Sequence, residues 1–284
     1  MQFNASAIKT IDQTTVESEG PRYPTISFIS GDITQKKAGG VGYEGGWFIG
    51  EDGAPTDMTA YGWEKDSIMT HSGKEIEGYW ARKIDIAVIN QRRRWTVEGE
   101  SFPWSQYEEA AKKGSPRGHQ QFLVLIKGAE DIGPFSITLK GHAGMSFQGA
   151  RQYASTGCLS VFNKTVVAAA NAKTKPAKWP YRAFWLTVGA AKNAKSEPLF
   201  TEVGSGNATS KIVLPVPVGL PEKASEVDLG TFYVGDDLLA VTNQLHVEST
   251  DWVAQWDTAQ SATKADATEE EPANHEANAE ELGL

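Results

Sequence analysis

A change of hydrophobic period along the middle of the chain limits its fold more than any other feature. From Trp80 to Trp95 apolar and polar residues alternate, with Ile84, Ile86 and Val88 on one face, which predicts a long strand. The same reading of apolar spacing predicts strands at 121–127 and 134–140, one or two helices within 146–172, and strands at 181–189 and 211–216.

The order strand, strand, strand, helix, strand, strand is that of the five-stranded oligonucleotide-binding (OB) barrel, although other α+β domains share it. The sequence therefore predicts a mostly antiparallel α+β fold with an OB-like barrel that has its helix between strands 3 and 4. The expected divisions of the chain are a flexible arm at 1–22, one β-rich domain at 23–256 with its core at about 80–216, and a disordered acidic tail at 257–284. Short β-rich runs at 23–30 and 43–49 add N-terminal strands, and a helix is predicted at 236–247.

Charge is divided unevenly along the chain. The 65 residues from Ile132 to Ser196 hold nine basic residues and no aspartate or glutamate, where the overall composition predicts about eight acids. Residues 257–284, in contrast, hold eight acidic residues and one lysine. This separation predicts an anionic partner for the acid-free window, and a phosphate backbone is the commonest extended anion that a soluble protein meets.

Cations beside aromatic side chains indicate where a single strand would bind, because cations neutralise phosphates and flat rings stack on unpaired bases. One cluster ends the long strand, where Arg93 and Trp95 share a face and Arg92 and Arg94 share the other. An exposed strand end paired with nearby carboxylates explains the same cluster equally well. The predicted nucleic-acid-binding residues are Arg92, Arg93, Arg94, Trp95, Lys140, Arg151, Lys164, Lys173, Lys175, Lys178, Trp179, Tyr181, Arg182 and Trp185.

A second cluster follows the helical stretch, at Lys173 to Trp185. Strand alternation over 181–189 assigns an apolar set to the core, which predicts that Tyr181 and Trp185 are exposed beside a lysine-rich loop. In the alternative interpretation, both rings pack beneath a C-terminal helix. The two interpretations differ in whether these rings can stack on bases.

The tail ends in Glu280, Glu281, Leu282, Gly283 and Leu284, so two leucines follow the acids. An acidic linker with an apolar end is typical of a peptide that docks into a basic-rimmed hydrophobic pocket of another protein. The same tail could instead occupy the protein's own basic groove and compete with nucleic acid.

The layout of the chain resembles that of the tailed single-stranded DNA-binding proteins of bacteria and phages, which place an OB barrel before a disordered acidic tail with a hydrophobic tip. Those tails usually end in an aromatic residue, whereas this chain ends in Leu284, and no motif of the body carries over a site.

These features predict a sequence-independent single-stranded DNA-binding protein of replication or recombination, whose tail docks a partner protein or inhibits binding. A phage or plasmid structural or assembly protein is the alternative from another class, because a tryptophan-rich β body would serve it equally well. A nucleic-acid-processing enzyme ranks below both. The histidines form no HExxH pair, and Glu130 with Asp131 is the only attractive pair of carboxylates near basic surface.

The bulk composition limits location and cofactors. No apolar run approaches the roughly 20 residues that cross a bilayer, and residues 1–11 lack the apolar middle of a signal peptide. The single cysteine, Cys158, excludes an internal disulfide framework and a multi-cysteine zinc site. We therefore expect a cytoplasmic protein with no cofactor, no metal and no membrane partner, and the sequence leaves open whether it forms a homo-oligomer.

Overall fold

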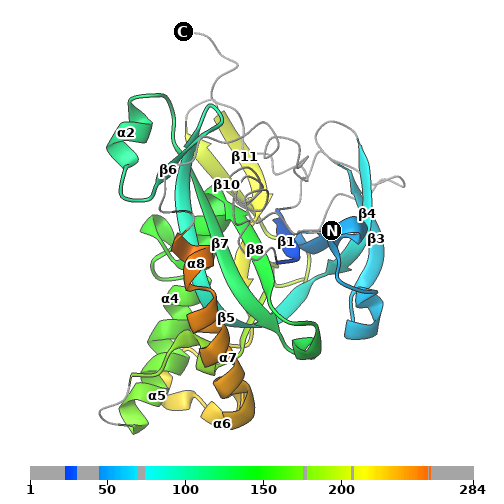
Figure 1. The fold of residues 1–284 in the computed structure, drawn as a ribbon, viewed down its shortest axis with the longest axis vertical. Helices are drawn as coiled ribbons and strands as arrows, with labels where there is room; N and C mark the ends of the chain where they lie inside the picture. Colours follow the sequence, from blue (N-terminus) through cyan, green and yellow to red (C-terminus); the bar gives the residue numbers. More distant parts are fainter. Residues whose placement is uncertain are drawn as a thin grey trace, which may run out of the picture.

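Ten strands form one strongly curled sheet, which wraps around the core as a half-barrel (Figure 1). The computed structural model describes residues 23–30, 45–69, 74–174, 178–205, 208–254 and 256. In sheet order the strands are β12 (Pro215–Pro217), β9 (Leu186–Ala190), β5 (Lys83–Val97), β7 (Arg117–Ile126), β8 (Phe135–Lys140), β1 (Thr25–Ile29), β2 (Gly46–Gly50), β4 (Glu75–Ala81) and β3 (Glu64–Met69), and β6 (Glu100–Pro103) pairs with the end of β5. All neighbours are antiparallel except β1 and β8.

Four of these strands form a Greek key. β5, β7 and β8 lie side by side in the sheet, with only the short β6 and α2 between β5 and β7 in sequence, and β9 returns after a long helical connection to lie beside β5. The predicted α+β class, the mostly antiparallel pairing and the helices between the third and fourth of these strands are confirmed. The sheet is wider than the predicted five-stranded barrel, because β1 to β4, which precede the expected core in sequence, extend it beyond β8.

Helices lie on both sides of the curled sheet. The helical connection contains α3 (Gly141–Gln148), α4 (Cys158–Phe162), a π-helical segment (Asn163–Val167) and α5 (Ala168–Lys173). After the strands come α6 (Leu229–Phe232), α7 (Asp236–Glu248) and α8 (Thr250–Ala254), while α2 (Tyr107–Ala111) follows β6 and β10 (Phe200–Ser205) pairs with β11 (Ala208–Val213) as a separate two-stranded sheet. The short 3-10 turns are η1 (Glu51–Gly53), η2 (Met58–Tyr61), η3 (Glu130–Ile132), η4 (Arg151–Tyr153), η6 (Tyr181–Ala183) and η7 (Ala224–Glu226). None of the helices within these described ranges combines the length and apolar character that a membrane crossing requires.

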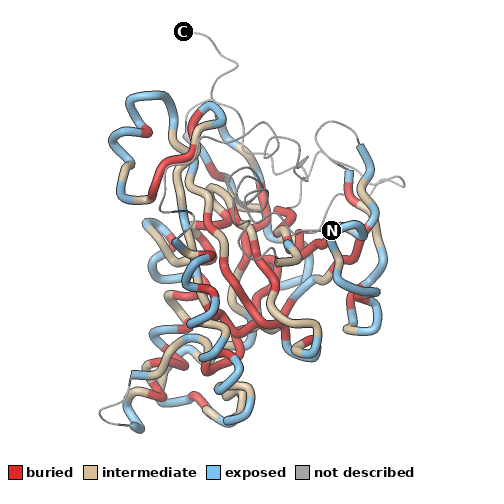
Figure 2. The backbone as a smooth tube through the Cα atoms, in the orientation of Figure 1, coloured by how far each residue is buried: buried red, intermediate tan, exposed pale blue. Residues whose placement is uncertain are grey.

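The core fills the inside of the half-barrel, where buried residues concentrate (Figure 2). Phe122, Phe135 and Trp47 are fully buried there, and the Trp47 indole donates a hydrogen bond of 3.0 Å to the carbonyl oxygen of Val188. This bond joins β2 to β9, which lie far apart in the strand order. The two sides of the curled sheet therefore approach each other across the core.

A second, smaller core lies on the outer face of the sheet. Leu123 and Leu125 of β7 and Ile89 of β5 pack there against Trp252 of α8, with Leu245 of α7 at the edge. The predicted helix at 236–247 is confirmed as α7. Its position on the outer face leaves the inner face to the main core.

Several boundaries differ from the predicted ones. The predicted strand from Trp80 to Trp95 is two strands, because the chain turns at Arg82 between β4 and β5. The predicted strand at 211–216 is divided between β11 and β12, which belong to different sheets. Only 186–190 of the predicted strand at 181–189 is a strand, since 181–183 forms a 3-10 turn.

A β-bulge divides β5 into two halves of opposite phase. Val88 pairs with Val124 of β7, but Asn90 pairs with Leu123, so Ile89 has no partner in the register. Even-numbered residues such as Ile86 and Val88 face the main core before the bulge. Beyond the bulge the odd-numbered residues face the inner side, so Arg93 and Trp95 point inward and Arg92 and Arg94 point outward.

Candidate nucleic-acid interface

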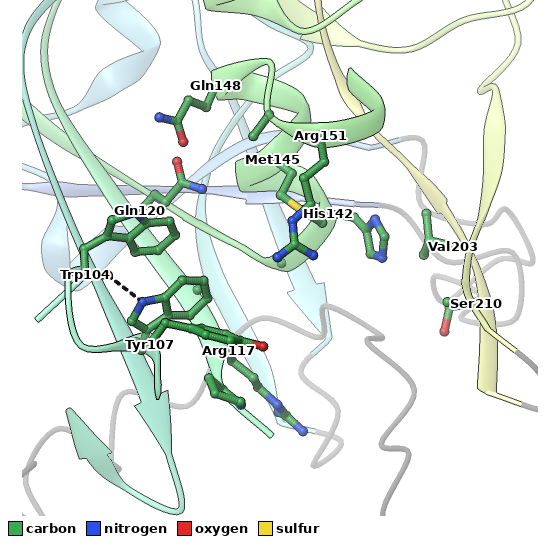
Figure 3. A pocket seen from close by; sticks show the side chains of 16 residues that line it. Trp104, Tyr107, Arg117, Gln120, His142, Met145, Gln148, Arg151, Val203 and Ser210 are labelled. Atoms are coloured by element: carbon green, nitrogen blue, oxygen red, sulfur yellow. Dashed lines mark hydrogen bonds between the residues drawn. The ribbon is translucent and has the colours of Figure 1, made fainter. Parts of the chain in front are cut away.

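A cavity of about 410 Å³, here called the mouth pocket, opens at one end of the half-barrel. The end of β5 with the following loop and α2 forms one wall, α3 forms the second and the β10–β11 hairpin the third (Figure 3). The 16 lining residues are Trp95, Trp104, Tyr107, Pro116, Arg117, Gly118, Gln120, Gly141, His142, Met145, Gln148, Ala150, Arg151, Val203, Gly204 and Ser210. No aspartate or glutamate is among these described residues, so the lining carries net positive charge.

Two stacked tryptophans form the aromatic wall. The rings of Trp95 and Trp104 lie 4.0 Å apart between centroids at an interplanar angle of 11°, and the Trp95 indole donates a 2.9 Å hydrogen bond to the Trp104 carbonyl oxygen. Tyr107 meets Trp95 edge-on at 4.9 Å. Gly118 lies beneath this pair, since a Cβ there would be 3.4 Å from both indoles. The contacts hold the rings in place as a flat surface at the opening.

Arginines flank the aromatic wall. The Arg93 guanidinium lies 4.9 Å from the centroid of the Trp104 ring, and the exposed side chains of Arg117 and Arg151 come from opposite sides of the pocket (Figure 3). Arg151 has a φ of +51°, in the left-handed region that non-glycine residues seldom occupy. Such backbone strain clusters at functional sites. Flat rings with adjacent cations are the combination that binds single strands.

Polar groups line the inside of the pocket. Gln120 on β7 is only 4% exposed and its side-chain amide has no hydrogen-bond partner among the described residues, although it lines the cavity. Gln148 on α3 also lines it. His142 interacts through Nδ1 with the hydroxyl of Tyr153 at 3.1 Å, and burial raises the pKa of Tyr153 above its usual value. The interior therefore offers neutral hydrogen-bonding groups behind a cationic rim.

Arg92 and Arg94, which the sequence analysis placed in the interface, contact tryptophans on the outer face instead. The Arg92 guanidinium lies 4.1 Å from the Trp252 ring centroid and 4.5 Å from that of Trp256, and Arg94 lies 4.3 Å from Trp256. Arg92 also donates to the Trp252 carbonyl and to Gln121, both at 2.8 Å. These contacts attach α8 to the sheet, because the bulge turns both arginines away from the mouth pocket.

Burial on the outer face changes the acidity of the basic groups. Desolvation, reinforced by the charge of Arg94, lowers the pKa of Arg92 to about 9, so it is charged at neutral pH. His119 pairs in register with Arg94 on one side and Lys140 on the other. Desolvation and then the neighbouring charges of Lys140, Arg94 and Arg117 lower the pKa of His119 to about 3. His119 is therefore a neutral imidazole within a row of cations.

The second predicted cluster lies at the end of the helical layer, which is formed by α4, the π-helical segment and α5, rather than at the mouth pocket. Its described members are Lys173, Lys178, Trp179, Tyr181, Arg182 and Trp185. Lys164, which was predicted separately, lies in the π-helical segment of the same layer. Lys175 and the tail residues Glu280, Glu281, Leu282 and Leu284 lie outside the described residues. The end of α5 and the β10–β11 hairpin are at opposite ends of the long axis of the protein (Figure 1). Lys173 to Trp185 therefore do not form one groove with the cluster at the end of β5, whereas Arg151 of the acid-free window lines the mouth pocket with Trp95.

The predicted exposure of Trp185 is wrong. Trp185 is 6% exposed and its backbone N–H donates to the Phe232 carbonyl at 2.7 Å. The alternation itself holds, since Phe184, Leu186 and Val188 belong to the main core and Trp185 does not. The Trp185 ring is nevertheless covered, with the Lys127 ammonium 5.9 Å from its centroid. Tyr181 is exposed, but its ring stacks on Phe162 at 6.2 Å. The alternative, in which both rings are buried, therefore holds for Trp185 and not for Tyr181.

Other members of this cluster, and Lys164, make structural contacts. Trp179 packs against Phe184 and Tyr233, with ring centroids 5.6 and 5.9 Å away. Arg182 donates to Asn243 at 2.7 Å, and the Lys164 ammonium donates to the Ala154 carbonyl at 3.0 Å. Lys173 and Lys178 are exposed. The contacts made by these residues connect the helical layer to α7 and to the turn after α6.

Sequence reasoning missed most of the mouth pocket, although it named Trp95 and Arg151. Trp104 and Tyr107 follow β6, a short return strand that brings them back beside Trp95. The signal available was the close spacing of three aromatic residues across one hairpin, with Arg117 at the start of the next strand. Gln120 carried no signal, because a polar residue at the start of an apolar run is normally exposed.

Two negative findings concern chemistry. Within the described ranges, no three or more His, Cys, Asp or Glu side chains gather in a way that could hold a metal ion. Glu130 and Asp131 form part of a 3-10 turn, where Asp131 accepts a 3.0 Å hydrogen bond from Tyr61. Cys158 is fully buried, and this burial raises the pKa of its thiol. Comparisons with protein-family models, with curated proteins and with solved structures find no match to this chain.

Proposed function

We propose that this protein binds single-stranded DNA at the mouth pocket, largely without regard to sequence, and acts in replication or recombination. The observation that carries the proposal is the stacked pair of Trp95 and Trp104, with Arg93 over the Trp104 ring and two further arginines at the rim. Bases of any kind can stack on such rings, and the arginines neutralise the phosphates between them. The carboxylate-free lining favours an anion over a neutral ligand.

The fold is compatible with this proposal. OB domains are partly open Greek-key barrels that bind oligonucleotides, and β9, β5, β7 and β8 form a Greek key within a curled sheet. The mouth pocket uses the ends of β5 and β7 from this set. We therefore assign the DNA-binding role to the end of the half-barrel, and not to the second cluster in the helical layer.

The acidic tail has a proposed role as a competitor. It follows Trp256, whose ring lies over Arg92 and Arg94 on the outer face of β5. A chain cut after Trp256 retains those contacts and loses the eight carboxylates of 257–284. We expect the truncated protein to bind DNA more tightly at low salt, and an unchanged dissociation constant would remove the inhibitory role. Docking of partner proteins by the tail is a separate proposal, tested by pull-down of a purified replication or recombination protein with and without the tail.

The direct test is a titration of fluorescent oligo-dT at several salt concentrations. Trp104→Ala should weaken binding by about fivefold or more, because a stacked base contributes roughly 1–3 kcal/mol. Tyr181→Ala removes an exposed ring of the second cluster and is the matched control, with no expected change. Absence of binding by the wild-type protein at low salt would refute the proposal.

A second pair of variants tests the cations. Arg117→Ala should reduce the slope of log affinity against log salt by about 0.7, the value for one phosphate contact on a single strand. Lys173→Ala removes an equally exposed cation from the helical layer and should leave the slope unchanged. The reverse result would return the interface to the second cluster.

A further inference from the structure

Gln120 is an unusual residue for the wall of a barrel core. It lies on the inner face of β7, in register with Arg93 on β5 and Leu139 on β8. The residue is only 4% exposed, and no hydrogen bond joins its side chain to another described residue. Neither amide atom is a fully buried group that lacks a partner. The amide therefore reaches the open space of the mouth pocket, where a bound ligand can hydrogen-bond to it.

The surroundings direct the amide into the mouth pocket. Gly144 of α3 lies against it, since a Cβ at that position would be 3.2 Å from Nε2 of Gln120 and 3.3 Å from the Leu139 carbonyl. The helix therefore approaches the amide from one side without covering it, and the amide group is among the groups that line the cavity (Figure 3). Trp95 and Trp104 line the same cavity, so a flat ring that contacts the indoles has an amide to meet at its edge.

We propose that the mouth pocket reads one base of the bound strand through Gln120, and that adenine is the preferred base. This inference rests on the proposed function. A glutamine carboxamide presents one donor and one acceptor side by side, which matches the N6 amino group and N7 of adenine in a bidentate pair. The cavity volume of about 410 Å³ lies in the range of small-ligand sites. Stacking on the indoles tolerates any base, whereas the position beside Gln120 discriminates adenine from the other bases.

The chemistry of the pocket favours a base over a free anion at this depth. The cations Arg117 and Arg151 are exposed, whereas Gln120 is buried and neutral. A phosphate therefore finds its partners at the rim, and the less polar base is the part that reaches the interior. Unpaired bases that are read by proteins are recognised by hydrogen bonds to their edges together with stacking on aromatic rings.

The test compares oligo-dT with the same oligonucleotide carrying a single central dA. The wild-type protein should bind the dA-containing strand at least about fivefold more tightly, the lower limit for one bidentate pair. Replacing that dA with a purine that lacks the 6-amino group should remove the gain. Equal affinity for all three strands would overturn the inference while leaving the proposed function intact, and absence of binding to any strand would refute both.

Gln120→Met is the critical variant, because methionine has similar length and no amide. The ratio of its affinities for the dA-containing strand and for oligo-dT should fall to about one, whatever its affinity for oligo-dT. Its midpoint of urea unfolding should be no lower than that of the wild-type protein, so loss of preference cannot be assigned to misfolding. Gly144→Ala keeps the amide and displaces it by a few tenths of an ångström, so a reduced preference is expected. Full retention of the dA preference in Gln120→Met would show that another group reads the base.

Discussion

The neutral His119 predicts a specific loss of stability in mild acid. Its pKa is about 3 in the folded protein and 6.5 in the unfolded chain, where solvent surrounds the imidazole. As pH falls below 6.5, the unfolded chain gains the proton and the folded protein does not. The contribution of His119 to the free energy of unfolding is therefore complete above pH 6.5 and is lost progressively as pH falls toward 3.

The size of the effect follows from the two pKa values. Between pH 7 and pH 5.5 the unfolded imidazole goes from mostly neutral to about nine-tenths protonated, which removes about 1.3 kcal/mol from the free energy of unfolding. This range lies above the ordinary pKa of exposed carboxyl groups, so the acidic tail contributes little. Stability should be measured from urea unfolding curves at both pH values, followed by tryptophan fluorescence with the m-value compared between curves.

His119→Gln is the matched control, because glutamine is polar, uncharged and close in size. All other groups are common to the two proteins, so their contributions cancel in the comparison. The wild-type protein should lose about 1.3 kcal/mol more than the variant between pH 7 and pH 5.5. Equal losses would refute the argument that Arg94, Lys140 and burial keep the imidazole neutral.

Three further predictions concern stability and reactivity. Arg92→Lys should lower the free energy of unfolding by about 1–3 kcal/mol, because lysine cannot maintain two directed hydrogen bonds and two ring contacts together; an unchanged urea midpoint would contradict this. Gly78→Ala should destabilise by about 1–3 kcal/mol or more, since its Cβ would lie 2.2 Å from the Ile49 carbonyl oxygen, whereas Gly53→Ala, with open space around it, should be nearly neutral in the same assay. Cys158 should react with a thiol reagent only when the protein unfolds, because the thiol is buried and its pKa is raised, and rapid labelling of the folded protein would disprove its burial.

The strands that could be predicted from sequence are those with a strong local pattern. β7 and β8 lie within or beside the predicted runs, because continuous apolar residues or strict alternation identify a strand without reference to its neighbours. The predicted change from strand to helix after β8 is also confirmed, because α3 begins at Gly141. By contrast, β1 pairs in parallel with β8, a contact between residues about 110 positions apart, and no local pattern indicates such a partner.

The candidate site was predictable only in part, because the β-bulge in β5 decides which side chains face the mouth pocket. Strand alternation correctly groups Arg93 with Trp95 and separates them from Arg92 and Arg94, but alternation alone does not indicate which pair faces the pocket. A charge count along the chain also treats sequence neighbours as spatial neighbours. Arg151 lies at the mouth pocket, whereas Lys173 is the last residue of α5, at the other end of the protein. A segment without acidic residues can therefore extend from one end of the protein to the other.

The bulge at Ile89 allows one strand to serve two purposes that can change independently. Before it, Ile84, Ile86 and Val88 belong to the main core, and substitutions there act on folding. After it, the inward-facing residues lead to Trp95 at the mouth pocket, and substitutions there alter what the protein binds. Regular alternation through the same residues, without the bulge, would instead place Arg92 and Arg94 at the opening and Trp95 outside. The extra residue therefore separates the part of β5 that is constrained by stability from the part that is free to acquire new ligands.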